Sequence, residues 1–390
     1  EGWAAGVTLL LEHGQGPWAE SRPGLLVDYC ASEVLEELDE KTREFLLVTS
    51  HLPYMTARMA CELTGNPHAS RILDDLVARN YFTGRREGVR TSYDFHALFR
   101  EFLQNRARTA MSRDRIASIL SRAASLMERE GEIGEAVELH RDAGNDRQIA
   151  EMVARHAAKT MEQGRGQTLL GWINSVSKKA LGKSAWLQYW QAVCLQPVDP
   201  TSAHQMFEDA FQLFKSQGDD RGALLSWSGA VDSLVHGWDV YTPLDRWIAW
   251  LDRYICDDGE FFDDMTEARV ATSMAGALMF RQLHRQDVKE WFERALSAAR
   301  NAGDPSLLLN IGFGYMYLCI WLGDFDRGMQ IIDELRTSLD IEQASPLVTI
   351  LFMGSEAFLH LVTGEPHKCL EIASEALDIA DSSGVHFRDS

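Results

Sequence analysis

The side chains in this 390-residue sequence that are best suited to binding chemistry are aromatic, and they concentrate between residues 227 and 254. The group consists of Trp227, Trp238, Tyr241, Trp247, Trp250 and Tyr254, with His236, Asp239 and Arg246 as polar neighbours. Flat apolar faces with a few polar groups suit a small sugar, fatty or aromatic compound. We therefore predict a ligand site made of Trp227, His236, Trp238, Tyr241, Trp247 and Trp250. The alternative is that these rings only fill the seams between packed helices.

Motifs for other kinds of chemistry are absent from the sequence. The twelve histidines form no HExxH or HxH pair and the six cysteines have no CxxC spacing, so no metal site is predicted. No pair or triad of residues suggests nucleophilic or acid–base catalysis. Gly312-Phe313-Gly314 lies inside a helical pattern, and the phosphate-binding motif GxxxxGK[ST] is missing. We therefore expect this chain to be no enzyme and to hold no cofactor of its own.

The charge of the chain is strongly acidic but uneven. A net charge of −20 argues against direct contact with nucleic acid, because phosphate binding depends on Lys and Arg. Residues 85–122 are the exception, with nine Arg against four acidic residues. This basic stretch could meet a nucleotide phosphate or an acidic neighbouring domain, or it could be a solvated helix face. No apolar run is long enough to span a bilayer and no signal peptide is present, so we expect no membrane contact and a cytoplasmic location.

The elements that would position these residues are repeated helices. Asp263, Asp304 and Ser345 each follow a turn and open a helical pattern, at a spacing of 41 residues. Asp219 and Gly384 extend the series in both directions. A fixed period near 40 that alternates apolar helices with short turns is typical of a helical-repeat solenoid. Solenoids bind partners or ligands along an extended surface, which favours sensing or docking over catalysis.

The first part of the chain follows a different pattern. Residues 25–80 contain three helical patterns, and the segments 81–82 and 89–93 then enclose the turn-prone stretch 84–88, as in a β-hairpin. Three helices followed by a hairpin is the order of a winged-helix domain. The sequence starts at Glu1 and stops at Ser390, where a new helix is due, so we expect a piece of a longer polypeptide.

Several segments, taken in order, resemble the MalT-type regulators, which are LuxR-family transcription activators of the signal-transduction ATPase (STAND) class. The segment EGWAAG at residues 1–6 is similar to the helix that closes their nucleotide-binding module. The segments FLLVTS at 45–50 and FHALFREFL at 95–103 are similar to winged-helix segments of that family. Residues 132–176 resemble its helical stretch after the winged helix, whereas the repeats match in period and turn style alone.

The resemblance implies a mainly all-α chain in four parts. These are the end of a nucleotide-binding module (1–20), a winged-helix domain (21–108), a helical arm (109–180) and a TPR-like α-solenoid of helix pairs that serves as sensor (181–390). A P-loop ATPase module would precede this chain and a helix-turn-helix DNA-binding module would follow it.

The implied function is regulatory. An inducer or a regulatory protein would bind the repeats and control ATP-dependent self-oligomerisation and DNA binding by the parent protein, which would hold ATP or ADP. His96 occupies the place of the winged-helix His that approaches the β-phosphate of ADP in STAND proteins, although Ala97 stands where other branches carry Asp. The alternative for His96 is local packing. The alternative for the whole chain is a protein–protein interaction scaffold without a small-molecule ligand.

Overall fold

The computed structural model describes residues 31–32, 34–88, 90–237, 240–257, 259–339 and 346–384. The chain divides into two compact units, residues 1–180 and 181–390, and each is described by itself. The expected end of a nucleotide-binding module at residues 1–20 lies outside the described residues, as does the repeat position Ser345.

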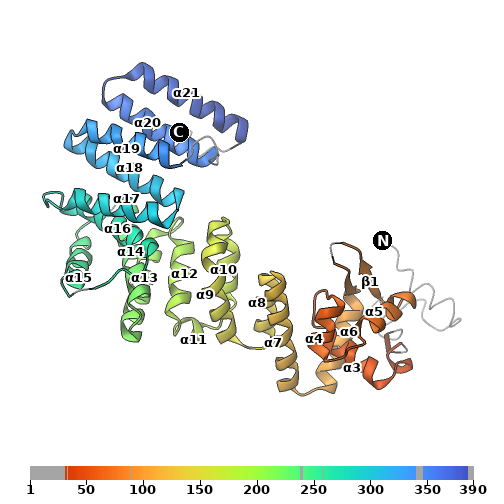
Figure 1. Cartoon of the computed structure of the whole chain (residues 1–390). Coiled ribbons are helices and arrows are strands. Elements are labelled where there is room, and N and C mark those ends of the chain that lie inside the picture. The colour runs from red at the N-terminus through yellow and green to blue at the C-terminus, as the bar shows by residue number, and fades with distance from the viewer. Residues whose placement is uncertain are drawn as a thin grey trace, which may run out of the picture. The chain divides into compact units, whose positions relative to one another are not determined.

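The first unit begins with three helices, a hairpin and a fourth helix (Figure 1). These elements are α3 (Glu40–Thr49), α4 (Ala57–Thr64), α5 (Ala69–Ala78), β1 (Thr83–Arg86), β2 (Ser92–Phe95) and α6 (Ala97–Ala110). Phe99 of α6 is buried, stacks on Phe82 at a centroid distance of 5.0 Å and meets the edge of Phe95 at 5.9 Å. Burial of these aromatic rings fixes α6 beneath the hairpin. The predicted winged-helix order is confirmed.

The hairpin differs in detail from the sequence prediction. Gly84 lies within β1, paired with Asp94, and does not form the turn. A Cβ at Gly84 would lie 2.9 Å from the Asp94 carboxylate, so a larger residue here would displace that side chain. Phe82, predicted to flank the turn in an extended segment, has a φ of 49° instead, and this left-handed conformation turns the chain into β1.

An arm of antiparallel helices completes the first unit: α7 (Arg113–Glu130), α8 (Ile133–Asp142), α9 (Asp146–Glu162), α10 (Gly166–Asn174) and the short α11 (Lys178–Leu181). Each of α7, α8 and α9 packs against the helix that follows it. Arg122 of α7 donates hydrogen bonds to the carbonyls of Glu62 at 3.0 Å and Leu63 at 2.6 Å. Because these carbonyls belong to the last turn of α4, which lacks helical partners for them, Arg122 caps α4 and joins the arm to the winged helix.

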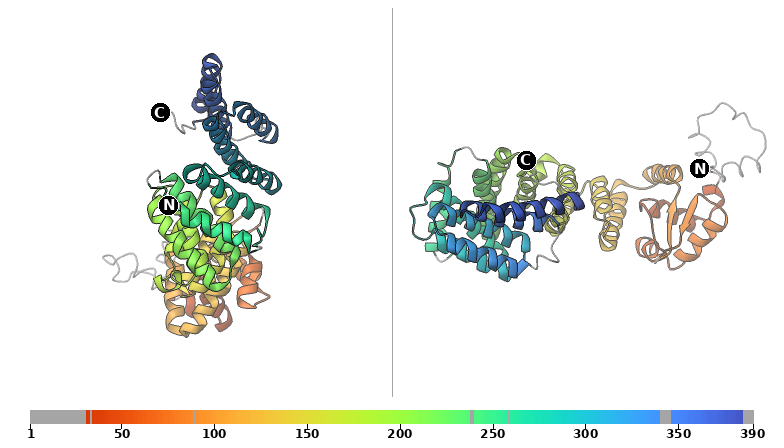
Figure 2. Two further views of the ribbon diagram at one scale, coloured as in Figure 1. Left: turned by 90° about the vertical axis from the view of Figure 1, so that its left-hand side faces the viewer. Right: turned by 90° about the horizontal axis from the view of Figure 1, so that it is seen from above.

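The second unit is built of helices throughout its described part (Figure 1). They are α12 (Ala185–Leu195), α13 (Pro200–Gln217), α14 (Asp220–His236), α15 (Leu244–Cys256), α16 (Asp264–Arg281), α17 (Val288–Ala302), α18 (Pro305–Leu322), α19 (Phe325–Leu339), α20 (Pro346–Val362) and α21 (Pro366–Ser383). From α16 onward they run as antiparallel pairs (Figure 1, Figure 2). The prediction of a mainly α-helical chain that ends in a solenoid is confirmed.

The repeat period has a physical basis in the helix ends. The side chains of Asp219, Asp263 and Asp304 accept hydrogen bonds from the backbone N–H three residues later, at 2.8, 2.7 and 3.0 Å. Each aspartate therefore satisfies a donor that a helix start leaves unpaired. Glycines with φ near 70° end α13, α17, α18 and α21. Aspartate starts and glycine stops thus set the length of each repeat.

The even-numbered helices α12, α14, α16, α18 and α20 contact one another in succession and form one layer, which we call the inner layer. One continuous core of buried side chains runs from Ala185 to Ala376 along this unit. The inner helices are apolar around most of their circumference, because each packs against a partner in its own pair and against neighbours in the layer. Such helices leave little room for a polar face except where the layer borders a hollow.

Candidate functional site

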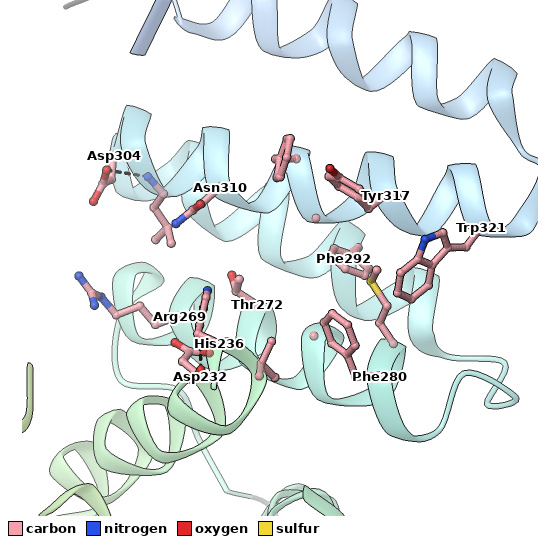
Figure 3. A pocket seen from close by; sticks show the side chains of 16 residues that line it. Asp232, His236, Arg269, Thr272, Phe280, Phe292, Asp304, Asn310, Tyr317 and Trp321 are labelled. Atoms are coloured by element: carbon pink, nitrogen blue, oxygen red, sulfur yellow. Dashed lines mark hydrogen bonds between the residues drawn. The ribbon is translucent and has the colours of Figure 1, made fainter. Parts of the chain in front are cut away.

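A hollow of about 610 Å³ opens on the inner layer of the second unit (Figure 3). Its walls come from the C-terminal end of α14, the exposed side of α16, and α18, with one ring from α17. The volume falls in the range of small-molecule binding sites. The hollow is the candidate functional site of this chain.

The polar side chains of the hollow gather at one end, which we call the charged end: Asp232 and His236 of α14 and Arg269 of α16 (Figure 3). Nδ1 of His236 lies 2.7 Å from the backbone carbonyl of Asp232. Burial raises the pKa of the Asp232 carboxyl, and the Ser273 hydroxyl and the nearby His236 and Arg269 partly offset that shift. Among the described residues the Arg269 guanidinium forms no ion pair. The Arg269 cation therefore stands near a carboxylate that is costly to keep charged.

The other end of the hollow, which we call the aromatic end, is lined by Phe280, Tyr317 and Trp321 (Figure 3). The edge of Trp321 meets Phe280 at a centroid distance of 5.7 Å, and Phe313 meets Tyr317 at 4.7 Å. The Trp321 side chain is 50% exposed. An exposed indole at the rim of a cavity supplies apolar contact area that no part of the described chain covers.

The residues predicted as ligand contacts fall in different places. His236 lines the hollow, and Tyr241 lies behind it, stacked on Phe280 at 5.1 Å. Trp227 is buried, and its indole N–H donates a 2.9 Å hydrogen bond to the carbonyl of Trp247. Trp238 lies outside the described residues.

Trp247 and Trp250 pack in the seam between α13 and α15. Both meet Phe211 edge to face, at 5.2 and 4.9 Å, and Trp250 also stacks on Tyr254 at 5.4 Å. Neither is among the residues that line the hollow. The structure thus brings His236 to a cavity and places Trp227, Trp247 and Trp250 in helix packing; whether any of the six binds a ligand stays a prediction.

The repeat period is the sequence signal that connects the residues lining the hollow. Four pairs of lining residues on α16 and α18 are separated by the repeat period of 41: Arg269 and Asn310, Thr272 and Phe313, Gly276 and Tyr317, and Phe280 and Trp321. Residues one period apart occupy equivalent faces of successive inner helices. Applying the 41-residue period to every position of the repeats, and not only to the helix caps, predicts that these side chains share one surface.

His96 lies at the start of α6, where its side chain is exposed and makes no capping hydrogen bond. An exposed imidazole at a helix N-terminus is in a suitable place to meet an anion, because unpaired N–H groups point the same way. The nucleotide contact of His96 remains a prediction.

The basic stretch 85–122 is largely occupied by contacts within the first unit. Arg86 pairs with Asp94 at 3.1 Å, Arg90 with Glu130 at 3.1 Å, and Arg115 with Glu44. Arg106 and Arg113 form no side-chain ion pair within the described ranges. Most of the local positive charge therefore stabilises the winged helix and its arm.

Two further features bear on the kind of site. Among the described residues, no three His, Cys, Asp or Glu side chains lie close enough to hold a metal ion. Nor does any helix in the described part of the chain have the length and apolar character needed to cross a membrane.

The fold defines a class of protein with a small N-terminal winged-helix domain followed by a helical-repeat unit. A STAND protein with a tetratricopeptide repeat sensor from Pyrococcus horikoshii superposes with a TM-score of 0.64, covering 96% of this chain and 54% of that one. At 13% identity this likeness concerns the fold alone.

Sequence comparison leads to a particular family. Residues 31–115 match the family model described as the MalT winged helix domain. The regulator MalT of Vibrio cholerae is 29% identical over 171 residues, 43% of this chain and 19% of MalT. The serine/threonine-protein kinase PknK of Mycobacterium tuberculosis is 28% identical over 222 residues, 54% of this chain and 20% of the kinase. The resemblance to MalT-type regulators is confirmed, and the aligned part spans about a fifth of the length of these relatives.

Proposed function

We propose that this chain is the regulatory sensor portion of a MalT-like, ATP-dependent transcription activator. An inducer binds the hollow on α14, α16 and α18 and favours the conformation in which the parent protein assembles. The observation that carries the proposal is the hollow itself, with Arg269 at one end and aromatic rings at the other. The relatives support it, because MalT is by name a transcriptional regulator and the structural neighbour is by title a STAND protein with a repeat sensor.

In this proposal the parent protein supplies the remaining machinery. Its ATPase module holds ATP or ADP, with His96 near the nucleotide phosphate, and its DNA-binding module reads the promoter. The inducer acts by population shift, so it must bind the assembling conformation more tightly than the resting one. The chain itself transfers no chemical group.

The test is a ligand screen with a blocked variant. Gly276 lines the hollow from α16, and a Cβ there would meet no heavy atom within 4 Å, so Gly276→Leu places a side chain in the hollow with room at its Cβ. Gly354 in α20 is equally open but does not line the hollow, which makes Gly354→Leu the matched control. A metabolite at about a hundredfold excess over its Kd should stabilise the wild-type chain by about 2.7 kcal/mol in calorimetry. We expect that stabilisation to survive in Gly354→Leu and to vanish in Gly276→Leu.

A second function has one observation in its favour. Leu322 and Phe325 are exposed beside Trp321 at the end of α18, and exposed apolar side chains next to one another suit a protein partner. A scaffold predicts that no metabolite in the screen shifts the unfolding transition of the second unit. That result, combined with partner capture that Trp321→Ala abolishes, would replace the sensor proposal.

A further inference from the structure

The hollow is long. Arg269 and Phe280 both line it and lie eleven residues apart on α16, which corresponds to roughly 16 Å at about 1.5 Å per residue. A ligand that contacts both Arg269 and Phe280 must therefore be extended along α16.

The walls between the two ends offer few hydrogen-bonding groups. The Thr272 hydroxyl donates at 2.6 Å to the carbonyl of Ala268 within α16, and its neighbours along the hollow are Gly276 and Met279. Asn310 supplies the amide on the opposite wall. A peptide or a sugar crossing this section would leave its polar groups without partners, at a cost that a hydrocarbon segment does not have.

Gly276 lies in the wall of the hollow between the charged and aromatic ends. Glycine in the middle of a helix destabilises it by roughly 1 kcal/mol relative to alanine. Gly276 is half-buried, yet no atom of the described chain lies where its Cβ would be. The missing side chain therefore leaves a gap in the wall between the two ends, nearer the aromatic end, where a ligand could approach the backbone closely.

The side chains at the charged end decide whether the part of a ligand bound there is anionic or cationic. Arg269 is the one formal cation among the described lining residues. Of the two carboxylates that line the hollow, Asp304 accepts a hydrogen bond from the N–H of Leu307 at 3.0 Å and caps α18. Asp232 lies half-buried beside Arg269 and competes with a ligand anion for it. An anionic head group that reaches Arg269 gains a charge-assisted hydrogen bond.

We infer that the hollow takes a linear anionic amphiphile, a long-chain carboxylate whose head group lies at Arg269 and whose tail passes Gly276 to end against Phe280 and Trp321. This inference rests on the proposed function and specifies its ligand class.

The experiment compares dodecanoate and octanoate, each below its micelle concentration, with dodecan-1-ol below its solubility limit, by isothermal titration calorimetry on the whole chain. We expect dodecanoate to bind about tenfold more tightly than the alcohol, because a hydrogen bond to a charged group contributes roughly 1.5 kcal/mol. Octanoate, too short to reach the aromatic end, should bind more weakly than dodecanoate. Maltotriose serves as the neutral sugar probe.

Variants distinguish the inferred ligand class from the proposed sensor function. Arg269→Gln should remove the preference for dodecanoate over the alcohol, Arg253→Gln at an exposed position of α15 should keep it, and Asp232→Asn should tighten dodecanoate binding. Gly276→Leu should abolish binding of both chains, and Gly354→Leu should retain it. Equal affinity for acid and alcohol, or binding that persists in Gly276→Leu, overturns the inference. If maltotriose binds instead, and Gly276→Leu abolishes that binding, the inference fails while the sensor function stands.

Discussion

His51 shows how burial of one residue links stability to pH. It follows α3, its side chain is 6% exposed, and its Nε2 has no hydrogen-bond partner among the described residues. Burial, with a smaller contribution from Arg108, lowers the pKa of His51 from 6.5 to about 4. Between these two values the unfolded chain binds a proton that the native chain does not, so stability must fall as the pH falls.

We therefore predict that acidification from about pH 7 to about pH 4 removes up to about 3 kcal/mol from the free energy of unfolding of the first unit through His51. Urea unfolding at a series of pH values measures this. In His51→Gln the slope over that window should decrease, because the titrating group is gone. The control is His68→Gln, since His68 is exposed. An unchanged slope in His51→Gln would show that other groups control the acid response.

Trp227 illustrates why residue type alone did not locate the ligand site. A tryptophan is equally suited to a ligand platform and to a helix seam, because both bury the ring and satisfy the indole N–H. The distinction depends on whether a helix or empty space lies opposite, and that is a property of the assembled layer. Trp227 faces Trp247 across a packed seam, whereas Trp321, of the same type, stands at the rim of the hollow.

At the scale of the element, the aspartates that cap the helix N-termini stabilise the repeated helices. Asp263→Ala removes the side-chain acceptor for Thr266 N–H and also the ion pair with Arg221 at 2.9 Å. We predict a loss of about 1–2 kcal/mol in the second unit, measured by calorimetry. Asp263→Asn keeps an acceptor and should lose less. The neighbouring exposed Asp264→Ala should change stability by less than about 0.5 kcal/mol. Equal losses at both positions would contradict a specific capping role.

The elements were largely predictable from the sequence because their signals are local. An aspartate before a helix and a glycine after it act within one turn, so Asp219, Asp263 and Asp304 gave the period before any packing was known. The hairpin was predicted less well. Its boundaries depend on the left-handed φ of Phe82 and on the close approach of Asp94 to Gly84, which are contacts across strands.

The hollow was not predictable from the same signals. The inner helices α14, α16 and α18 are apolar on several sides, so no single polar stripe marks the face that borders the cavity. Gly276 has no recognisable motif around it, and its meaning comes from the empty space where its Cβ would be. Periodicity indicates which residues share a face, but the spacing between successive helices decides whether that face closes or leaves a cavity.

At the scale of the whole molecule, the sequence gives the net charge and the structure shows which charged side chains are paired. The net charge of −20 would repel a polyanion, and the arginines of residues 85–122 that offset it locally are mostly bound to carboxylates or carbonyls of the first unit. Formal charge in a stretch of sequence is therefore a poor guide to charge available for a partner. What counts is the cation left without a partner, such as Arg106 or Arg113 within the described ranges.

This reasoning predicts that the chain alone does not bind duplex DNA. Non-specific binding depends on releasing counterions from phosphates neutralised by Lys and Arg, and weak binders have a Kd of about 10⁻⁴ M or higher at physiological salt. Fluorescence anisotropy with a labelled duplex at about 0.15 M salt should show no saturable increase. If binding appears, weakens with added salt and disappears in Arg106→Gln/Arg113→Gln, then two unpaired arginines outweigh the acidic surface, and direct nucleic-acid contact by this part of the chain would have to be accepted.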